Sequence, residues 1–197
     1  MGKHVDFYFT PLSPWTFLGM ARFRAMVARH GAEVSVRPVD FGPIFARTGG
    51  LPLHQRPKER QAYRLMELTR WSRQLGIPMT LHPRHFPTNG ELACWLIIAA
   101  PGQDAQLRLT EAVGAACWQQ ERDIADPGTL EAVANQAGLD GKALLARARQ
   151  PDIAATRARF AEEAAAAGVF GAPTFVIEGE LFWGQDRLDF VERKLAG

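Results

Sequence analysis

The first forty residues of the chain show two hydrophobic periods. Residues 5–9 (VDFYF) form a compact β-prone segment and residues 33–39 alternate between apolar and polar positions, so both predict strands. Between them, apolar residues recur at helical spacing from Ser13 and Pro14 until Gly31. Ser is a favoured helix N-cap, Pro is preferred in the first helical position, and Gly commonly ends a helix. Strand, helix and strand of this length predict a βαβ unit with parallel strands and a right-handed crossover.

Residues 41–168 follow helical spacing and contain almost no strand pattern. Turn signals divide this stretch at residues 76–78 (GIP), 101–102 (PG) and 126–128 (DPG). An alanine-rich run (AEEAAAAG) near its end has high helix propensity and a Gly stop. The predicted helices cover residues 57–75, 89–99, 104–120, 129–137, 140–149 and 153–167.

Strand character returns only at the end of the chain. Residues 174–177 (TFVI) and 181–183 (LFW), joined by a turn at 178–180, predict a β-hairpin, and residues 186–195 predict a terminal helix. The order βαβ, helices, ββα predicts an α/β protein of thioredoxin-like fold with a large all-helical insertion. We place the discontinuous thioredoxin-like domain at residues 1–41 and 169–197, and the helical insertion domain at 42–168.

Composition and charge exclude several classes of protein. The 197 residues carry 23 Lys and Arg against 21 Asp and Glu, scattered along the chain, which argues against a nucleic-acid partner. The start of the chain does not read as a secretory signal, and the longest apolar run, residues 93–100, is too short to span a membrane. Cys94 and Cys117 are well separated and form no disulfide framework, zinc site or CxxC pair. We therefore expect buried thiols and a cytoplasmic protein.

The predicted N-terminus of the first helix is the place where chemistry is expected. Its free N–H groups and the positive end of the helix dipole stabilise an anion. Ser13, Pro14, Trp15 and Thr16 occupy this place with the spacing of a C-P-x-C motif, but hydroxyls replace both thiols. Thiol–disulfide exchange is therefore excluded. Ser13 is either only an N-cap or a hydroxyl donor to a thiolate supplied by another molecule.

Two later segments complete the candidate site. Residues 171–175 (GAPTF) resemble a cis-proline loop, in which Ala172 would offer its backbone to a peptide ligand as an added strand. The alternative is an ordinary trans proline at a strand edge. Residues 183–187 (WGQDR) lie at the predicted start of the last helix, where N–H groups would bind a carboxylate and Asp186 would pair with an amino group. Their alternative role is a helix cap with an exposed Arg.

Three segments carry a resemblance to a known family. The stretches VDFYFTPLSPWTFL, TRWSRQLGIP and FGAPTFVIEGELFWGQDRLDFVE closely resemble 2-hydroxychromene-2-carboxylate isomerases and the related kappa-class glutathione transferases, and the order of elements agrees along the chain. This family belongs to the DsbA-like branch of the thioredoxin superfamily. The resemblance implies glutathione as the cofactor, a small electrophilic substrate and a homodimer. It also implies a contact of Ser13 with the glutathione sulfur.

The resemblance assigns further contacts by position. Ala172 and Pro173 would bind the cysteinyl backbone of glutathione, and the γ-glutamyl end would be surrounded by Trp183, Gly184, Gln185 and Asp186. The substrate contacts would be Phe45, Gln55, Arg56 and Phe86. In this last set the chain departs from the naphthalene-pathway isomerases, which carry Lys, Asn and Tyr where this chain has Phe45, Gln55 and Phe86.

The leading hypothesis is a glutathione-dependent isomerase that acts on an activated C=C bond of an aromatic 2-oxo or 2-hydroxy carboxylate. A kappa-class-like glutathione transferase or peroxidase and a non-catalytic thioredoxin-like binding module are the alternatives. His82 and His85 have no third ligand at a suitable spacing, so we expect no metal site. The cations of residues 58–73 form a solvated face, or one or two of them hold a substrate carboxylate; they are Lys58, Arg60, Arg64, Arg70 and Arg73. Trp71, Trp95 and Trp118 are expected in the core, and Phe86 either joins them or lines a pocket between the domains.

Overall fold

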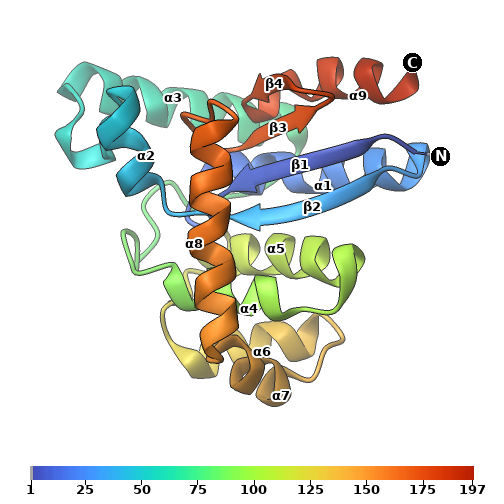
Figure 1. Ribbon diagram of the computed structural model, residues 1–197. Coiled ribbons are helices and arrows are strands. Elements are labelled where there is room, and N and C mark those ends of the chain that lie inside the picture. The colour runs from blue at the N-terminus through green and yellow to red at the C-terminus, as the bar shows by residue number, and fades with distance from the viewer. Residues whose placement is uncertain (1) are drawn as a thin grey trace.

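The computed structural model describes residues 2–197 and contains a four-stranded sheet with the order β2-β1-β3-β4 (Figure 1). The strands are β1 (His4–Phe9), β2 (Glu33–Pro38), β3 (Thr174–Ile177) and β4 (Glu180–Trp183). β1 runs parallel to β2 and antiparallel to β3, and β3 pairs with β4 as a hairpin. The predicted βαβ unit and the predicted hairpin are both confirmed.

Helices occupy the chain between and after the strands. Their bounds are α1 (Pro14–His30), α2 (Phe41–Thr48), α3 (Lys58–Leu75), α4 (Glu91–Ala99), α5 (Gly102–Trp118), α6 (Pro127–Gln136), α7 (Gly141–Ala148), α8 (Pro151–Ala166) and α9 (Leu188–Ala196), with short 3-10 turns η1 (Leu53–Gln55) and η2 (Gln185–Arg187). All six predicted insertion helices are present, and α2 is an additional one. The predicted boundary after residue 41 falls one residue inside α2, and the division into two domains stays a prediction.

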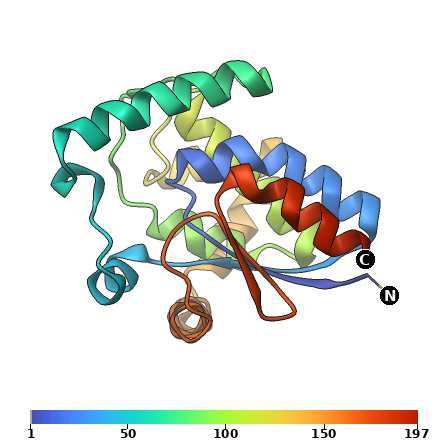
Figure 2. The same cartoon turned by 90° about the horizontal axis from the view of Figure 1, so that it is seen from above.

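Helices cover both faces of the sheet. Figure 2 shows α1 and α9 on one face, while α8 is seen end-on against the other. On the α1 face, the rings of Phe7 and Phe175 stack at 5.1 Å and Phe23 of α1 lies within 5 Å of both. On the α8 face, buried Tyr8 packs in a smaller cluster with Ala164 of α8. This division follows from strand geometry, because neighbouring residues of β1 point to opposite faces.

The helices after α3 extend the core that α1 begins. α5 packs against α1, and its last residue, Trp118, is fully buried among apolar side chains. Cys94 and Cys117 are buried free thiols, and burial raises their pKa to about 11 and about 12. Both thiols are therefore protonated at neutral pH, the form in which a cysteine is a poor nucleophile. Within residues 2–197, no helix has the length and apolar character that a membrane crossing requires.

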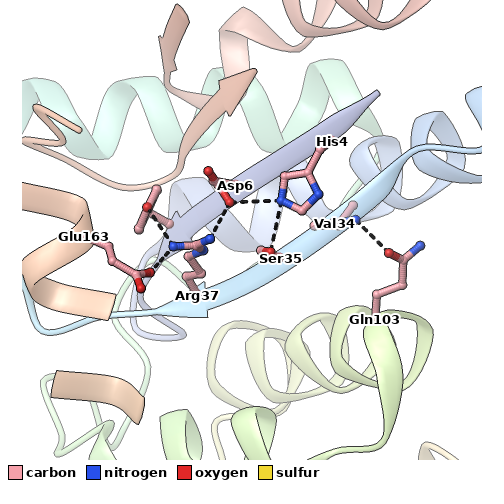
Figure 3. Close-up of polar contacts among 8 residues, drawn as sticks. His4, Asp6, Val34, Ser35, Arg37, Gln103 and Glu163 are labelled. Atoms are coloured by element: carbon pink, nitrogen blue, oxygen red, sulfur yellow. Dashed lines mark hydrogen bonds and ion pairs between the residues drawn. The ribbon is translucent and has the colours of Figure 1, made fainter. Parts of the chain in front are cut away.

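A group of charged side chains fastens α8 to the sheet. Arg37 of β2 pairs with Asp6 of β1 at 2.7 Å and with Glu163 of α8, and it also donates to the Tyr8 hydroxyl (Figure 3). Its side chain is only 18% exposed. A cation that is this far from water needs its carboxylate partners, so Arg37 holds three elements together.

We expect Arg37→Met to lower the free energy of unfolding by about 2 kcal/mol, since it leaves two partly buried carboxylates without their shared cation. The matched control is Arg159→Met, because Arg159 also pairs with Glu163 but its side chain is 63% exposed. That substitution should cost less than about 0.5 kcal/mol. Urea denaturation of both variants measures the difference, and equal costs would contradict the role given to Arg37.

Candidate active site

The register of the sheet brings three distant segments to one edge. Tyr8 lies opposite Thr174 of β3, and Thr174 lies opposite Trp183 of β4. Three segments therefore adjoin this row of residues. Residues 10–13 follow β1, residues 171–173 precede β3, and residues 184–187 follow β4. These are the three segments in which the sequence predicts the site.

Ser13 is the N-cap of α1. Its backbone is extended (φ −80°, ψ 120°), and its Oγ accepts a hydrogen bond of 3.1 Å from the N–H of Thr16. The side chain is buried, and its hydroxyl hydrogen has no acceptor among the residues that the structure describes. A hydroxyl holds one donor and two acceptor positions. The capping bond therefore leaves the Ser13 proton free to donate to a ligand.

Thr16 places a second hydroxyl in the first turn of α1. It is 2% exposed, and its Oγ1 has no hydrogen-bond partner within residues 2–197. Buried hydroxyls are normally paired, since leaving one unpaired costs about 1–3 kcal/mol. The start of α1 thus holds two hydroxyl groups with unused hydrogen-bonding capacity.

The loop before β3 presents unpaired backbone to the same edge. The Ala172–Pro173 peptide bond is cis, as in the predicted loop. The Pro173 carbonyl accepts from the N–H of Gly184 at 2.9 Å, and the hydroxyl of Thr174 donates to the carbonyl of Gly171 at 2.7 Å. In contrast, the N–H and C=O of Ala172 have no partner in the part of the chain that the structure describes. The Pro173 carbonyl and the Thr174 hydroxyl are therefore held by hydrogen bonds, while the N–H and C=O of Ala172 are left for a ligand.

The segment after β4 differs from its prediction. The last helix begins at Leu188 rather than at residue 186, because residues 185–187 form the turn η2 first. Asp186 does not cap that helix; its carboxylate is paired with Arg187 at 2.8 Å. Gly184 has a φ of 107°, and a Cβ at this position would collide with Asp186. The helical part of the chain therefore begins inside the predicted segment, as a 3-10 turn that continues directly into α9, and the predicted ligand contacts of Trp183–Asp186 stay predictions.

Two residues of this segment face opposite directions. Gln185 is 2% exposed, and both its side-chain and its main-chain oxygen accept hydrogen bonds from Arg22 of α1. These two hydrogen bonds join η2 to α1 and engage both oxygens of Gln185. Trp183 is 50% exposed and packs against Phe170, with ring centroids 4.8 Å apart and ring planes tilted by 60°. An aromatic pair thus stands beside the Ala172 loop.

The predicted substrate residues fall into two groups. Phe45 is half-buried on α2, where it packs against Phe41. Gln55 is exposed in η1. Arg56 follows it and donates to the carbonyl of Leu51 at 2.8 Å.

The second group lies between α3 and α5. Phe86 is half-buried on the loop before α4, and its ring lies 4.7 Å from that of Trp118. Arg64 of α3 contacts the same two rings, with its guanidinium carbon 6.0 and 5.8 Å from their centroids. The sequence predicts Arg64 only as one of five cations, because the pattern does not show which of them turns inward.

Comparison with known proteins shows the family of the chain. The family model of the DSBA-like thioredoxin domain matches residues 4–196. The chain belongs to this family. It is 30% identical over 198 residues to the 2-hydroxychromene-2-carboxylate isomerase of Sphingobium xenophagum, and the match covers 99% of both proteins.

Solved structures share the fold. The structure of 2-hydroxychromene-2-carboxylate isomerase superposes with a TM-score of 0.82 at 22% identity, over 98% of this chain and 94% of that one. The cytosolic disulfide reductase DsbM from Pseudomonas aeruginosa, solved with GSH, superposes with a TM-score of 0.68 at 19% identity, over 98% of this chain and all of the other. The predicted thioredoxin-like fold of the DsbA branch is confirmed.

The two histidines that the sequence analysis considers as metal ligands lie outside the site. His82 and His85 are exposed on the loop between α3 and α4. Residues 2–197 contain no group of three or more His, Cys, Asp or Glu side chains arranged to hold a metal ion.

The unpaired Thr16 hydroxyl can be tested by its effect on stability. Thr110 of α5 is an equally buried threonine, but its hydroxyl donates to the carbonyl of Gln106 at 2.8 Å. We expect Thr110→Val to lower the free energy of unfolding by about 1 kcal/mol, and Thr16→Val to leave it unchanged or raise it. Urea denaturation without any ligand compares the two variants. An equal loss in both would mean that the Thr16 hydroxyl is paired in the protein.

Proposed function

We propose that this protein is a glutathione-dependent isomerase acting on an activated C=C bond of an aromatic 2-oxo or 2-hydroxy carboxylate. One observation carries the proposal: Ser13 uses its oxygen to cap α1 and keeps its hydroxyl proton free at the positive end of the helix. A free donor at that place suits an anionic sulfur. Since neither position 13 nor position 16 is a cysteine, the sulfur must come from another molecule.

The residues present fit glutathione at this edge. Ser13 would donate to its sulfur and favour the thiolate over the thiol. The free N–H and C=O of Ala172 would pair with the cysteinyl backbone in the manner of an added strand. Asp186 is exposed beside them and would attract the γ-glutamyl amino group. When bound, glutathione would supply a thiolate that adds reversibly to the C=C bond, permits rotation and leaves by elimination.

The chain itself would orient the reactants and lower the pKa of the thiol. Holding the sulfur and the acceptor carbon together removes the entropic cost of their encounter. The Ser13 hydroxyl donates a hydrogen bond but stays unmodified through the reaction. The relative from Sphingobium xenophagum, which matches over its full length, is named as an isomerase of this class and supports the assignment.

A glutathione transferase or peroxidase is the second candidate. Three of the four positions matched to substrate contacts differ in type from the naphthalene-pathway pattern, which favours another electrophile. The two activities differ in stoichiometry, since an isomerase leaves total glutathione constant while a transferase or peroxidase consumes it. The homodimer and the cytoplasmic location stay predictions.

Glutathione thiolate absorbs near 240 nm, so titration of the protein–glutathione complex with pH tests the role of Ser13. We expect the wild-type protein to show bound thiolate at a lower pH than free glutathione. Ser13→Ala should raise this apparent pKa by about one unit or more and reduce turnover about tenfold or more, because one donor to the anion is lost.

Ser13→Asp separates this role from capping. Asp126 and Asp140 already cap α6 and α7 in this protein, so Asp at position 13 keeps the cap. Its negative charge opposes a thiolate, and the apparent pKa should rise further than in Ser13→Ala while the stability stays near that of the wild type. An unchanged titration in both variants would refute the role of Ser13. No thiolate in the wild type, together with peptide binding that glutathione does not compete with, would favour the non-catalytic binding module.

A further inference from the structure

Helix α3 and the turn before it carry an excess of positive charge. From Arg56 to Arg73 the chain has six Lys and Arg residues and two Glu residues, whereas the whole chain is nearly balanced. One of the two glutamates, Glu67, is already paired with Arg70. The excess is therefore local and is not neutralised on the helix itself.

Within this group, Arg64 is the residue that needs an anion. It is half-buried, and no carboxylate of residues 2–197 forms an ion pair with it. Two arginines of α1 have polar partners: Arg24 pairs with Glu111, and Arg22 donates to both oxygens of Gln185. An unpaired cation in partly apolar surroundings is costly, and proteins usually provide a partner.

The electrostatics agree with this reading. Burial and the neighbouring charge of Arg56 lower the pKa of Arg64 to about 10. Burial and the charge of Arg60 lower the pKa of Arg56 in the same way. Arg56 is thus repelled by both Arg64 and Arg60, and a bound anion would relieve that repulsion.

The surroundings of Arg64 also indicate the shape of the anion. Its guanidinium lies over the rings of Phe86 and Trp118, which are tilted by 48° to each other. Phe86 is half-buried rather than enclosed, so a flat molecule can share its apolar surface while a carboxylate meets the arginine.

The loop that carries Phe86 reaches the candidate site. It ends at Gly90, where a Cβ would lie 3.0 Å from the side chain of Leu12, the residue before Ser13. Helix α3 also contacts α1, as the view in Figure 2 shows. Arg64 and Ser13 are therefore on adjoining elements and not on opposite sides of the molecule.

We propose that Arg64, assisted by Arg56, binds the carboxylate of a planar aromatic substrate whose ring lies against Phe86. The proposal rests on the proposed function for the role of the ligand as substrate. Of the four residues that the resemblance assigns to the substrate, only Arg56 is charged, so a carboxylate needs this arginine or a neighbouring cation such as Arg64. A carboxylate also terminates glutathione, and the test separates the two sources.

Binding of 2-naphthoate to the full-length protein, measured by calorimetry, tests this assignment. Arg64→Met should weaken binding about tenfold or more, because a charged hydrogen-bonding partner is lost. Arg64→Lys should recover part of the affinity, since an ammonium keeps the charge but not the bidentate geometry. Arg73→Met is the matched control on the same helix: Arg73 is exposed, and its loss should change affinity less than twofold.

Two further arms identify what Arg64 recognises. The uncharged 2-naphthamide should bind weakly and equally to wild type and Arg64→Met, and glutathione affinity should change less than twofold in that variant. In wild type, the Nε–H resonance of Arg64 should shift on addition of 2-naphthoate, a readout that does not depend on any variant folding.

Three results would overturn the proposal. The first is an unchanged affinity of Arg64→Met for 2-naphthoate. The second is an equal loss of affinity for 2-naphthamide, which would show that Arg64 only packs against the ring. The third is a loss of affinity for glutathione alone, which would assign Arg64 to the glutathione carboxylate. The thiolate titration is independent of all three. Binding of 2-naphthoate through Arg64 in a protein that forms no glutathione thiolate would refute the proposed function and leave this site in place.

Discussion

The pairing of β3 with β1 is the constraint on which the candidate site depends. Tyr8, Thr174 and Trp183 form one row across three strands, and the loop before α1, the Ala172 loop and the turn η2 all adjoin that row. A shift of one residue in this register would turn every side chain of β3 to the other face. The stacked rings of Phe7 and Phe175 on one face oppose such a shift. The packing of the core thereby fixes the geometry of the site.

Capping and donation are compatible roles for Ser13 because they use different parts of one hydroxyl. The oxygen accepts from the N–H of Thr16, and the proton is left free. A cysteine at this position would itself carry the reactive sulfur, whereas a serine can only stabilise a sulfur that binds there. The enclosed hydroxyl of Thr16 and the N–H and C=O of Ala172 also lack a hydrogen-bond partner in the part of the chain that the structure describes. Each is a polar group that the fold itself does not satisfy.

Local patterns predicted the fold well, since strand periods, the Ser13–Pro14 start and the Gly31 stop depend on neighbouring residues. They failed where tertiary contacts decide. The turn η2 precedes the last helix and is joined to α1 by Arg22 and Gln185, a contact between distant residues that no local pattern shows. Arg64 looked like its neighbours on α3, and only the packing of Phe86 and Trp118 makes it different. The predicted ligand roles of the site residues stay predictions.

The most direct test of the central claim is a crystal structure of the protein with glutathione. We expect the sulfur within hydrogen-bonding distance of the Ser13 Oγ and the cysteinyl backbone paired with the N–H and C=O of Ala172. Ser13 should still accept the capping bond from Thr16. Glutathione bound elsewhere, or a sulfur out of reach of Ser13 with the Ala172 backbone unpaired, would contradict the account.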